Sequence, residues 1–255
     1  MSTLTYILLA TFIGSIGALI GGLILLAREK FAVRISSFLA SFAAGILLGA
    51  AFFDLLPEAV HEGEELGIDI FSWVLAGILI FFLIERTIHW FHHHENIHEH
   101  NKESKSTLPL IIISDTAHNF IDGIVIAATF MTNPALGVAT TIAVFAHEIP
   151  QEIGDFGLML HKGLTRGKII LVNIASAALA IFGALLTYML GNFLEGYIPA
   201  LLALTAGFFI YIALSDLMPE IHYEKKRRFA AIKGTLLLLG IIVMWIVSSV
   251  LGHGN

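Results

Sequence analysis

Eight long apolar runs constrain this chain more than any other feature of its sequence. Each is about 20 residues or longer, which is the length of helix needed to cross a hydrocarbon layer about 30 Å thick. In lipid, a helix satisfies every backbone hydrogen-bonding group within its own segment. We therefore predict an all-α integral membrane protein with eight transmembrane helices in a single domain, residues 1–255. The predicted spans are 4–27, 36–57, 70–90, 108–131, 135–160, 169–190, 198–221 and 229–251.

The composition excludes several other classes of protein. Only 13% of the residues are charged, about half the share found in soluble domains, so a soluble enzyme could not cover its surface. The formal net charge of −6 and the absence of a basic domain argue against a nucleic-acid partner. The chain has no cysteine, so any metal must be held by nitrogen and oxygen atoms.

The basic residues predict how the spans are oriented. All 14 lysines and arginines lie in or beside four alternate connections, and the other connections and both termini carry none. Basic loops stay in the cytoplasm, so both termini are predicted to lie outside. The four groups are Arg28, Lys30 and Arg34; Arg86, Lys102 and Lys105; Lys162, Arg166 and Lys168; and Lys225, Lys226, Arg227, Arg228 and Lys233.

A short sequence repeat occurs in the second and seventh spans. Ala-Gly at 44–45 is followed by Asp-Leu-Leu-Pro-Glu at 54–58, and Ala-Gly at 206–207 is followed at the same spacing by Asp-Leu-Met-Pro-Glu at 216–220. The two spans cross the membrane in opposite directions, and inverted repeats of this kind are typical of secondary transporters. We predict an inverted repeat that relates spans 1–3 to spans 6–8 around central spans 4 and 5.

Spans four and five carry polar residues that are costly in lipid. Helical spacing places them on adjoining stripes, and the two spans are antiparallel neighbours joined by a short turn. With a rise of about 1.5 Å per residue, His118 lies roughly 15 Å and His147 roughly 18 Å deep, near the midplane. The residues are Asp115, His118, Asn119 and Asp122 in span four, and His147, Glu148, Gln151, Glu152 and Asp155 in span five.

These polar residues predict a site for a cation. Five unpaired carboxylates would cost on the order of 12–17 kcal/mol, and no span centre supplies a lysine or arginine. Imidazole, carboxylate and amide groups suit Zn²⁺, Fe²⁺ or Mn²⁺, whereas an interhelical hydrogen-bond network is the simpler alternative. Pro150 leaves the carbonyl of Ala146 free, either to line a cavity or as a packing kink. The candidate metal ligands are His118, Asn119, Asp122, His147, Glu148, Gln151 and Glu152.

Two clusters flank the predicted site. An acidic group at the outer end of span two would concentrate cations if it forms a mouth, although it could also be an ordinary solvated loop. A histidine-rich cytoplasmic loop, 91–107, has a metal-binding composition and could equally be dispensable. The acidic group comprises Glu58, His61, Glu62, Glu64, Glu65 and Asp69, and the candidate loop ligands are His92, His93, His94, His98 and His100.

Two other functions compete with metal transport. The segment 147–151 resembles the H-E-x-x-H motif of zinc proteases, with Gln151 in place of the second histidine. An intramembrane metalloprotease with Glu148 as general base is therefore an alternative. A proton-coupled carrier of an organic substrate, needing no metal, is a third.

The chain resembles the ZIP (Zrt/Irt-like) family of divalent metal transporters over essentially its whole length. The resemblance is carried by His-Asn-Phe-Ile-Asp-Gly at 118–123 and His-Glu-Ile-Pro-Gln-Glu-Ile-Gly-Asp at 147–155. It implies a metal centre at mid-membrane, alternating access, movement of metal toward the cytosol, and frequent assembly as a homodimer. By this resemblance His118, Asp122, His147, Glu148 and Gln151 match metal-ligand positions, with Asn119 assisting. Asp54 and Asp216 match pathway positions, and we add Asp115 and Asp155 to the predicted pathway.

The sequence also departs from the family pattern. Span six offers only Asn173 and Ser176 where some relatives place a carboxylate for a second metal, and Gln151 is a neutral ligand. We expect a zinc transporter, not an enzyme, in the cell membrane, with a prokaryotic plasma membrane favoured. Its expected partners are divalent metal ions and the lipid bilayer, and Fe²⁺, Mn²⁺ or Cd²⁺ remain possible substrates.

Overall fold

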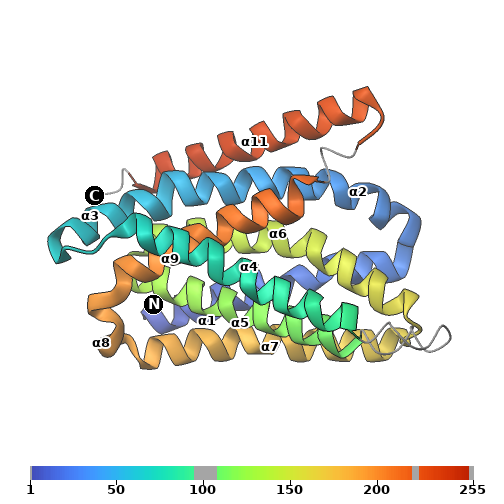
Figure 1. Cartoon of the computed structure of the whole chain (residues 1–255), viewed down its shortest axis with the longest axis horizontal. Helices are drawn as coiled ribbons and strands as arrows, with labels where there is room; N and C mark the ends of the chain where they lie inside the picture. The colour runs from blue at the N-terminus through green and yellow to red at the C-terminus, as the bar shows by residue number, and fades with distance from the viewer. Residues whose placement is uncertain (1, 95–107, 220–223, 253–255) are drawn as a thin grey trace.

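The chain folds into a bundle of long helices (Figure 1). This computed structural model describes residues 2–94, 108–219 and 224–252, and no strand occurs among them. The α-helices are α1 (Thr3–Gly14), α2 (Ile20–Ala50), α3 (Leu56–Leu66), α4 (Ile70–His94), α5 (Leu108–Thr132), α6 (Pro134–His161), α7 (Arg166–Met189), α8 (Gly191–Leu194), α9 (Ile198–Ile212) and α11 (Arg227–Gly252). Short elements join them: the 3-10 turns η1 (Gly17–Leu19) and η3 (Glu195–Tyr197), and the π turns η2 (Ala51–Leu55) and η4 (Ala213–Leu217).

The all-α prediction is confirmed, and the described part of each predicted span is helical or nearly so. The first two spans are separated at Arg28, whose backbone leaves the helical region (φ −144°, ψ 64°). Among the described residues, four helical stretches are apolar enough, by length and composition alone, to cross a membrane: Thr3–Leu66, Arg166–Met189, Glu195–Leu217 and Arg227–Leu251. Neither α5 nor α6 is among these stretches; these helices carry the polar residues of spans four and five, which lower their mean hydropathy. α6 continues through Pro150 as one helix.

Local sequence signals explain where several helices begin and end. The hydroxyl of Ser2 accepts a hydrogen bond from the backbone N–H of Thr5 at the start of α1. The side-chain oxygen of Asn133 accepts from the N–H of Leu136 at 2.7 Å, and Pro134 occupies the first turn of α6, where its missing N–H costs nothing. Gly67 ends α3 in the left-handed conformation that favours glycine (φ 67°).

The distribution of polarity is inverted relative to a soluble protein. Large apolar side chains point outward, among them Phe71, Leu171, Met189, Phe193 and Val250. Carboxylates, imidazoles and amides are buried instead, on α5, α6 and α7. This arrangement is typical of a protein whose outer surface contacts lipid.

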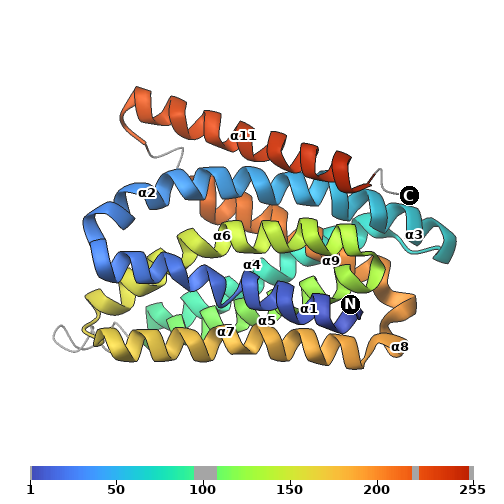
Figure 2. The ribbon, with the colours of Figure 1, turned by 180° about the vertical axis from the view of Figure 1, so that it is seen from behind.

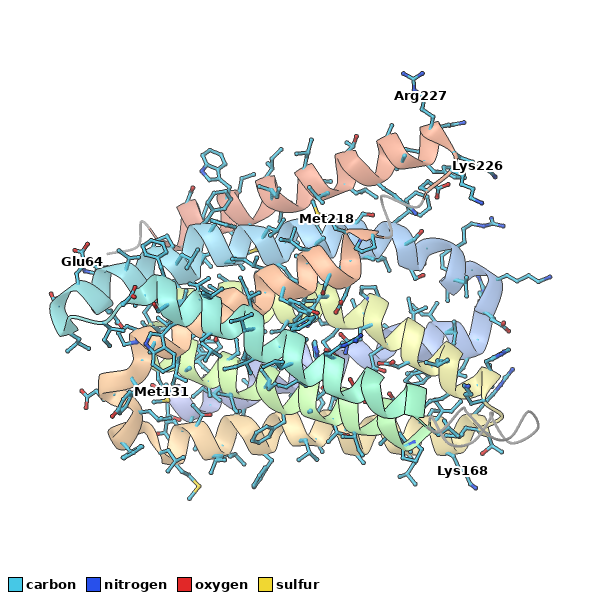
Figure 3. All side chains as sticks on the ribbon, in the orientation of Figure 1. Glu64, Met131, Lys168, Met218, Lys226 and Arg227 are labelled. Carbon is cyan, nitrogen blue, oxygen red and sulfur yellow. The ribbon has the colours of Figure 1, made fainter. Side chains whose placement is uncertain are left out.

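The bundle has one basic and one acidic end. Lys168, Lys226 and Arg227 lie toward one end, and Glu64 lies at the opposite end (Figure 3). α1 begins and α11 ends toward the end that holds Glu64 (Figure 1). Seen from behind, α1 lies across α5 and α6 (Figure 2), against which it packs. The predicted orientation requires the basic connections to share one side of the membrane; which end of the bundle faces the cytoplasm stays a prediction.

Helices α2 and α11 cross at a pair of glycines. A methyl group at Gly45 would lie 2.0 Å from the carbonyl oxygen of Leu237, and one at Gly240 would lie 2.3 Å from that of Phe42. Both distances are far below van der Waals contact. The two backbones therefore approach as closely as they do because both positions lack a side chain.

The crossing of α4 with α9 has the same construction. A methyl group at Gly207 would lie 2.3 Å from the carbonyl oxygen of Val74, and one at Gly77 would lie 2.3 Å from that of Leu204. Gly207 is the glycine that the sequence repeat aligns with Gly45. The contact that the second span makes with the eighth is thus reproduced by the seventh span with the third.

The repeated Asp-Leu-x-Pro-Glu segments form matching π turns. In η2 the N–H of Leu56 donates to the carbonyl of Ala51, and in η4 the N–H of Met218 donates to that of Ala213 at 2.9 Å. Both bonds span five residues. In Figure 1, α2 and α9 run in opposite directions into these turns, so the two copies have opposed orientation within the bundle.

The η2 turn receives a hydrogen bond from α11. Pro57 has no N–H for the carbonyl of Phe53, and the hydroxyl of Ser248 donates to that oxygen at 3.2 Å. We expect Ser248→Ala to lower the free energy of unfolding by about 1 kcal/mol, because the Phe53 carbonyl loses a hydrogen bond from a neighbouring helix. Thermal melting of the purified protein in detergent measures the change. Ser249→Ala is the matched control, because the Ser249 hydroxyl donates to the Trp245 carbonyl of its own helix. Equal melting of the two variants would contradict the expectation.

Candidate metal centre

Four predicted ligands meet between α5 and α6. His118 and Asp122 come from α5, and His147 and Glu148 come from α6. One ligand atom from each side chain lies within 4.8 Å of all the others. The last three are buried, and the side chain of His118 is 10% exposed. We call this set the quartet.

Five of the six distances within the quartet lie close to those of a tetrahedral zinc site. Zinc lies about 2.0–2.2 Å from nitrogen and oxygen ligands, so the ligands of a tetrahedral site are separated by roughly 3.3–3.6 Å. The Nε2 atoms of His118 and His147 are 3.1 Å apart. His118 Nε2 lies 3.8 Å from Asp122 Oδ2 and 3.5 Å from Glu148 Oε1. The corresponding distances from His147 Nε2 are 3.5 Å and 3.7 Å.

The charges of the quartet suit a divalent cation. Asp122 and Glu148 supply two negative charges when ionised, and neutral imidazoles supply lone pairs, so one divalent ion makes the set neutral. Asp122 Oδ2 and both carboxylate oxygens of Glu148 are buried and accept no hydrogen bond. Buried polar atoms are normally satisfied; a cation would provide the missing partner.

Contacts around the two imidazoles orient them toward the centre. His147 Nδ1 lies 2.9 Å from the carbonyl oxygen of Ala143, so it carries the proton and Nε2 presents its lone pair to the quartet. The rings of His118 and Phe81 meet edge to face with centroids 5.6 Å apart, and His147 packs against Phe209 at 6.2 Å. Aromatic rings from α4 and α9 therefore line the site: Phe81 and Phe209, respectively.

A second group of polar side chains lies beside the quartet. The amide of Asn119 donates to Asp115 Oδ1 at 3.0 Å and to the Ser176 hydroxyl of α7 at 3.4 Å. Glu152 is buried, and neither of its carboxylate oxygens has a hydrogen-bond partner. Gln151 and Asp155 are half-buried on α6. Asn173 donates to the Ile169 carbonyl of its own helix at 2.8 Å. Of the two polar residues of span six, Ser176 therefore bonds to α5, whereas Asn173 bonds within α7.

The two predicted pathway aspartates lie in the π turns. Asp54 in η2 is half-buried, and its Oδ2 atom has no hydrogen-bond partner. Asp216 in η4 is exposed and accepts a hydrogen bond from the hydroxyl of Ser215 at 2.5 Å. The two aspartates occupy equivalent positions in the sequence repeat, but they differ in exposure and in hydrogen bonding.

The acidic residues near α3 play different local roles. The amide of Asn133 donates to Glu58 Oε1 at 3.0 Å and joins α3 to the start of α6. Hydrogen bonds from Ser72 to Asp69 cap α4 and lower the pKa of the Asp69 carboxyl. Burial, followed by repulsion from Glu58, raises the pKa of Glu62. Part of the predicted mouth thus serves helix capping and packing.

The histidine-rich segment is only partly described. α4 continues to His94, so the backbone of residues 91–94 is helical rather than part of a loop. The side chains of His92, His93 and His94, and all of His98 and His100, lie outside the described residues. Their predicted metal binding remains a prediction.

Comparison with known proteins shows the family of this chain. The family model described as "ZIP Zinc transporter" matches residues 2–109 and 107–248. The chain belongs to the ZIP zinc transporter family. It is 31% identical to zinc transporter ZIP13 of Pongo abelii over 229 residues, covering 82% of this chain and 66% of that protein. Against zinc transporter ZIP6 of Homo sapiens the identity is 36% over 146 residues, 54% of this chain and 19% of that protein.

These similarities cover different shares of this chain and of its relatives. With zinc transporter ZIP4 of Rattus norvegicus the identity is 40% over 119 residues, 47% of this chain and 18% of that protein. The chain thus spans about a fifth of the first relatives it matches and just under two thirds of ZIP13. Membership of the ZIP family, together with the apolar helices, makes this a multi-pass membrane protein.

Several groups around the site were not foreseen from the sequence. Phe81, Phe209 and the Ala143 carbonyl contact the imidazoles, and Ser176 contacts Asn119. Ala143 precedes His147 by four residues, so a helical turn could have suggested that contact. The aromatic residues come from α4 and α9, and nothing in their sequence spacing indicates which face the site.

Proposed function

We propose that this protein transports zinc across the membrane into the cytoplasm. The proposal rests chiefly on one observation, the buried quartet whose four ligand atoms lie within 4.8 Å of one another. Its two imidazoles and two carboxylates offer the tetrahedral nitrogen and oxygen set that zinc prefers. The relatives named above are zinc transporters by name, which supports the same substrate. Fe²⁺, Mn²⁺ and Cd²⁺ are the candidate alternative cargoes.

The two ends of the bundle support a proposal for the orientation of the protein in the membrane. We propose that the end with Lys168 and Arg227 faces the cytoplasm and that both termini lie outside, because basic residues collect on the cytoplasmic side. Eight spans would then cross the bilayer. The repeated glycine crossings and π turns support an inverted repeat, and rocking of such repeats around a fixed site is a general mechanism of alternating access.

In this mechanism zinc leaves water outside and is held by the quartet at mid-membrane. Asp122 and Glu148 neutralise the ion, and the Ala143 carbonyl keeps the His147 ring oriented for it. Asn119 and Gln151 are proposed to assist as neutral ligands. The cost of removing water from Zn²⁺ is offset because four ligands replace it without leaving net charge.

The protease alternative is not supported. Members of the ZIP family are transporters rather than enzymes. In addition, zinc proteases keep a coordination position open for water, whereas here His118, Asp122, His147 and Glu148 offer four protein ligands, Glu148 among them. Glu148 is therefore proposed as a ligand, and not as a general base.

Zinc flux into proteoliposomes tests the proposed function. We expect vesicles that contain the purified protein and a trapped zinc indicator to fill saturably on addition of zinc, at least about tenfold faster than protein-free vesicles. A carrier saturates because each chain holds a limited number of ions. Parallel additions of Fe²⁺, Mn²⁺ and Cd²⁺ as competitors rank the cargoes. Folded protein that binds zinc but gives no flux would overturn transport and would favour a sensor.

Two further properties are proposed from the resemblance alone. Assembly as a homodimer follows from what is common among ZIP transporters, and chemical cross-linking in native membranes would test it. Residence in a prokaryotic plasma membrane is the localisation that we favour.

A further inference from the structure

The places where backbones touch divide the helices into two groups. In the first group, Gly123 of α5 lies against the main chain of α7, and Gly183 of α7 lies against that of α5. Gly21, at the start of α2, lies against the main chain of α6, and α1 packs on α5, α6 and α7. We call α1, the part of α2 before Arg28, α5, α6 and α7 the site group, because the quartet lies on α5 and α6.

The second group is held together by the two glycine crossings of α2 with α11 and of α4 with α9. Helix α3 packs on α4 and α9 and belongs to this group as well. We call the part of α2 after Arg28, α3, α4, α9 and α11 the frame group. Every described glycine that lies against the main chain of another helix does so within its own group. The groups meet each other where α6 packs on α11 and where α5 packs on α9.

An apolar layer separates the quartet from the acidic end of the bundle, where α9 begins (Figure 1). Phe209 of α9 is level with the quartet because its ring packs on His147. Ala203 therefore lies about 9 Å nearer the acidic end, at about 1.5 Å per residue. Ala203 and Ala139 of α6 are at most 1% exposed and belong to one apolar cluster. An ion from the acidic end cannot cross this packed layer unless the two groups move apart.

A hydrogen bond joins the two groups at the acidic end. Asn133, in the turn between α5 and α6, donates from its amide nitrogen to Glu58 Oε1 of α3 at 3.0 Å. The amide can donate in that direction because its oxygen accepts from the N–H of Leu136. Both side chains of the bond are half-buried, so water competes with it less than at an open surface. Met131, two residues before Asn133, lies toward the same end as Glu64 (Figure 3).

We infer that the bond between Asn133 and Glu58 is a latch, which holds the bundle closed on its acidic side and must open before an ion can reach the quartet from that side. The inference rests on the proposed transport function for the role of the latch. The bond and the apolar layer lie on the same side of the quartet and connect the same two groups, so a separation that opens the layer also breaks the bond. Losing a hydrogen bond to a carboxylate changes such an equilibrium on the order of tenfold.

The reactivity of a cysteine in the apolar layer measures how often the latch opens. The chain has no cysteine of its own, so Ala203→Cys gives purified protein a single reporter for a water-soluble thiol reagent. Asn133→Asp keeps the oxygen that caps α6 but places one carboxylate against another, which breaks the latch. We expect the reporter to be labelled about tenfold faster when Asn133→Asp is added. An unchanged labelling rate would overturn the inference.

Exchanging the donor and the acceptor separates the latch from a general loss of stability. When Glu58→Gln is combined with Asn133→Asp, the new amide can donate to the new carboxylate, and the bond is restored in the reverse direction. Labelling of the reporter should then return to within about twofold of the reporter alone. If the double variant is labelled as fast as Asn133→Asp, the bond is not the cause and the latch is wrong. Glu195→Ala, which removes an exposed carboxylate in η3, is the control for charge alone.

A covalent bridge at the same place tests whether transport requires the latch to open. In Glu58→Cys/Asn133→Cys, a short reducible reagent that carries two thiosulfonate groups joins the two thiols. We expect zinc flux into proteoliposomes to fall at least about tenfold and to return after reduction. The control pair is Ser2→Cys/Thr5→Cys, because these two hydroxyls lie 2.8 Å apart at the start of α1, within one group. Undiminished flux through bridged protein would overturn the requirement for opening.

The labelling result does not depend on whether the protein transports zinc. If proteoliposomes show no flux but Asn133→Asp speeds labelling of the reporter, transport is overturned and the latch is retained as a closure of the bundle. If flux is normal but labelling is unchanged, the latch is overturned and transport is retained. The two proposals can therefore fail separately.

Discussion

Replacing Asp122 with alanine is expected to reduce zinc uptake by proteoliposomes to the level of protein-free vesicles. The change removes one of the two negative charges in the quartet and leaves bound zinc with a net positive charge in a buried site. Loss of an outer partner of a metal ligand typically costs 10–100-fold in affinity or activity, so loss of a ligand should cost more than about 100-fold. Uptake measured with a radioactive zinc isotope resolves a difference of that size.

The folded state should survive this substitution. Asp122 Oδ2 is buried without a hydrogen-bond partner, so removing the carboxylate relieves a desolvation cost in the metal-free protein. We expect the melting temperature of Asp122→Ala without zinc to equal or exceed that of the wild type, and the stabilisation produced by added zinc to disappear. Asp122→Asn keeps the shape and should fail in the same way. A variant that transports at half the wild-type rate would show that the quartet is not the transport site.

Replacing Gly123 with alanine is expected to be the most destabilising small substitution among those considered. A methyl group there would lie 1.8 Å from the carbonyl oxygen of Ala180 and 2.6 Å from its carbonyl carbon. These are backbone atoms of α7, so no side chain can move aside and the two helices must separate. Overpacking typically costs about 1–3 kcal/mol, and this site should reach or exceed the upper value. The melting temperature should fall by on the order of 10 °C.

Gly234→Ala provides the matched control for Gly123→Ala. Gly234 also lies inside a helix, but a methyl group there would have no atom within 4 Å beyond its own helix. Alanine stabilises an open helical position by about 0.5–1 kcal/mol relative to glycine. The two variants should therefore move the melting temperature in opposite directions. If Gly123→Ala melts within a degree of the wild type, the close approach of α5 and α7 is wrong.

The sequence was sufficient to predict the helices, and its seven candidate metal ligands include the four residues of the quartet. Lipid requires long apolar helices, so eight apolar runs indicate eight helical segments with little competition from other structures. His118 and Asp122 are spaced by one helical turn, and His147 and Glu148 are adjacent on the next span, so their convergence needs only that the two helices face each other. The side chains that cost most in lipid were also those that identified the site.

Contacts between distant helices could not be predicted in this way. Nothing in the spacing of Ser248 indicates that it satisfies the Phe53 carbonyl, and nothing selects Phe81 and Phe209 from the other aromatic residues. These choices depend on how α4, α9 and α11 are rotated against the centre, which local periodicity does not determine. Likewise, the repeat aligned Asp54 with Asp216, but their different exposure follows from the neighbours that each π turn happens to have.

The two glycine crossings exclude side chains for the same steric reason at two places in the molecule. The crossing of α2 with α11 and that of α4 with α9 each bring two backbones together with no room for a methyl group on either partner. A side chain at any one of the four glycines would meet main-chain atoms, and a smaller neighbouring side chain could not make room for it. These two crossings therefore give the two halves of the protein the same close backbone packing, which depends on glycine at each of the four positions.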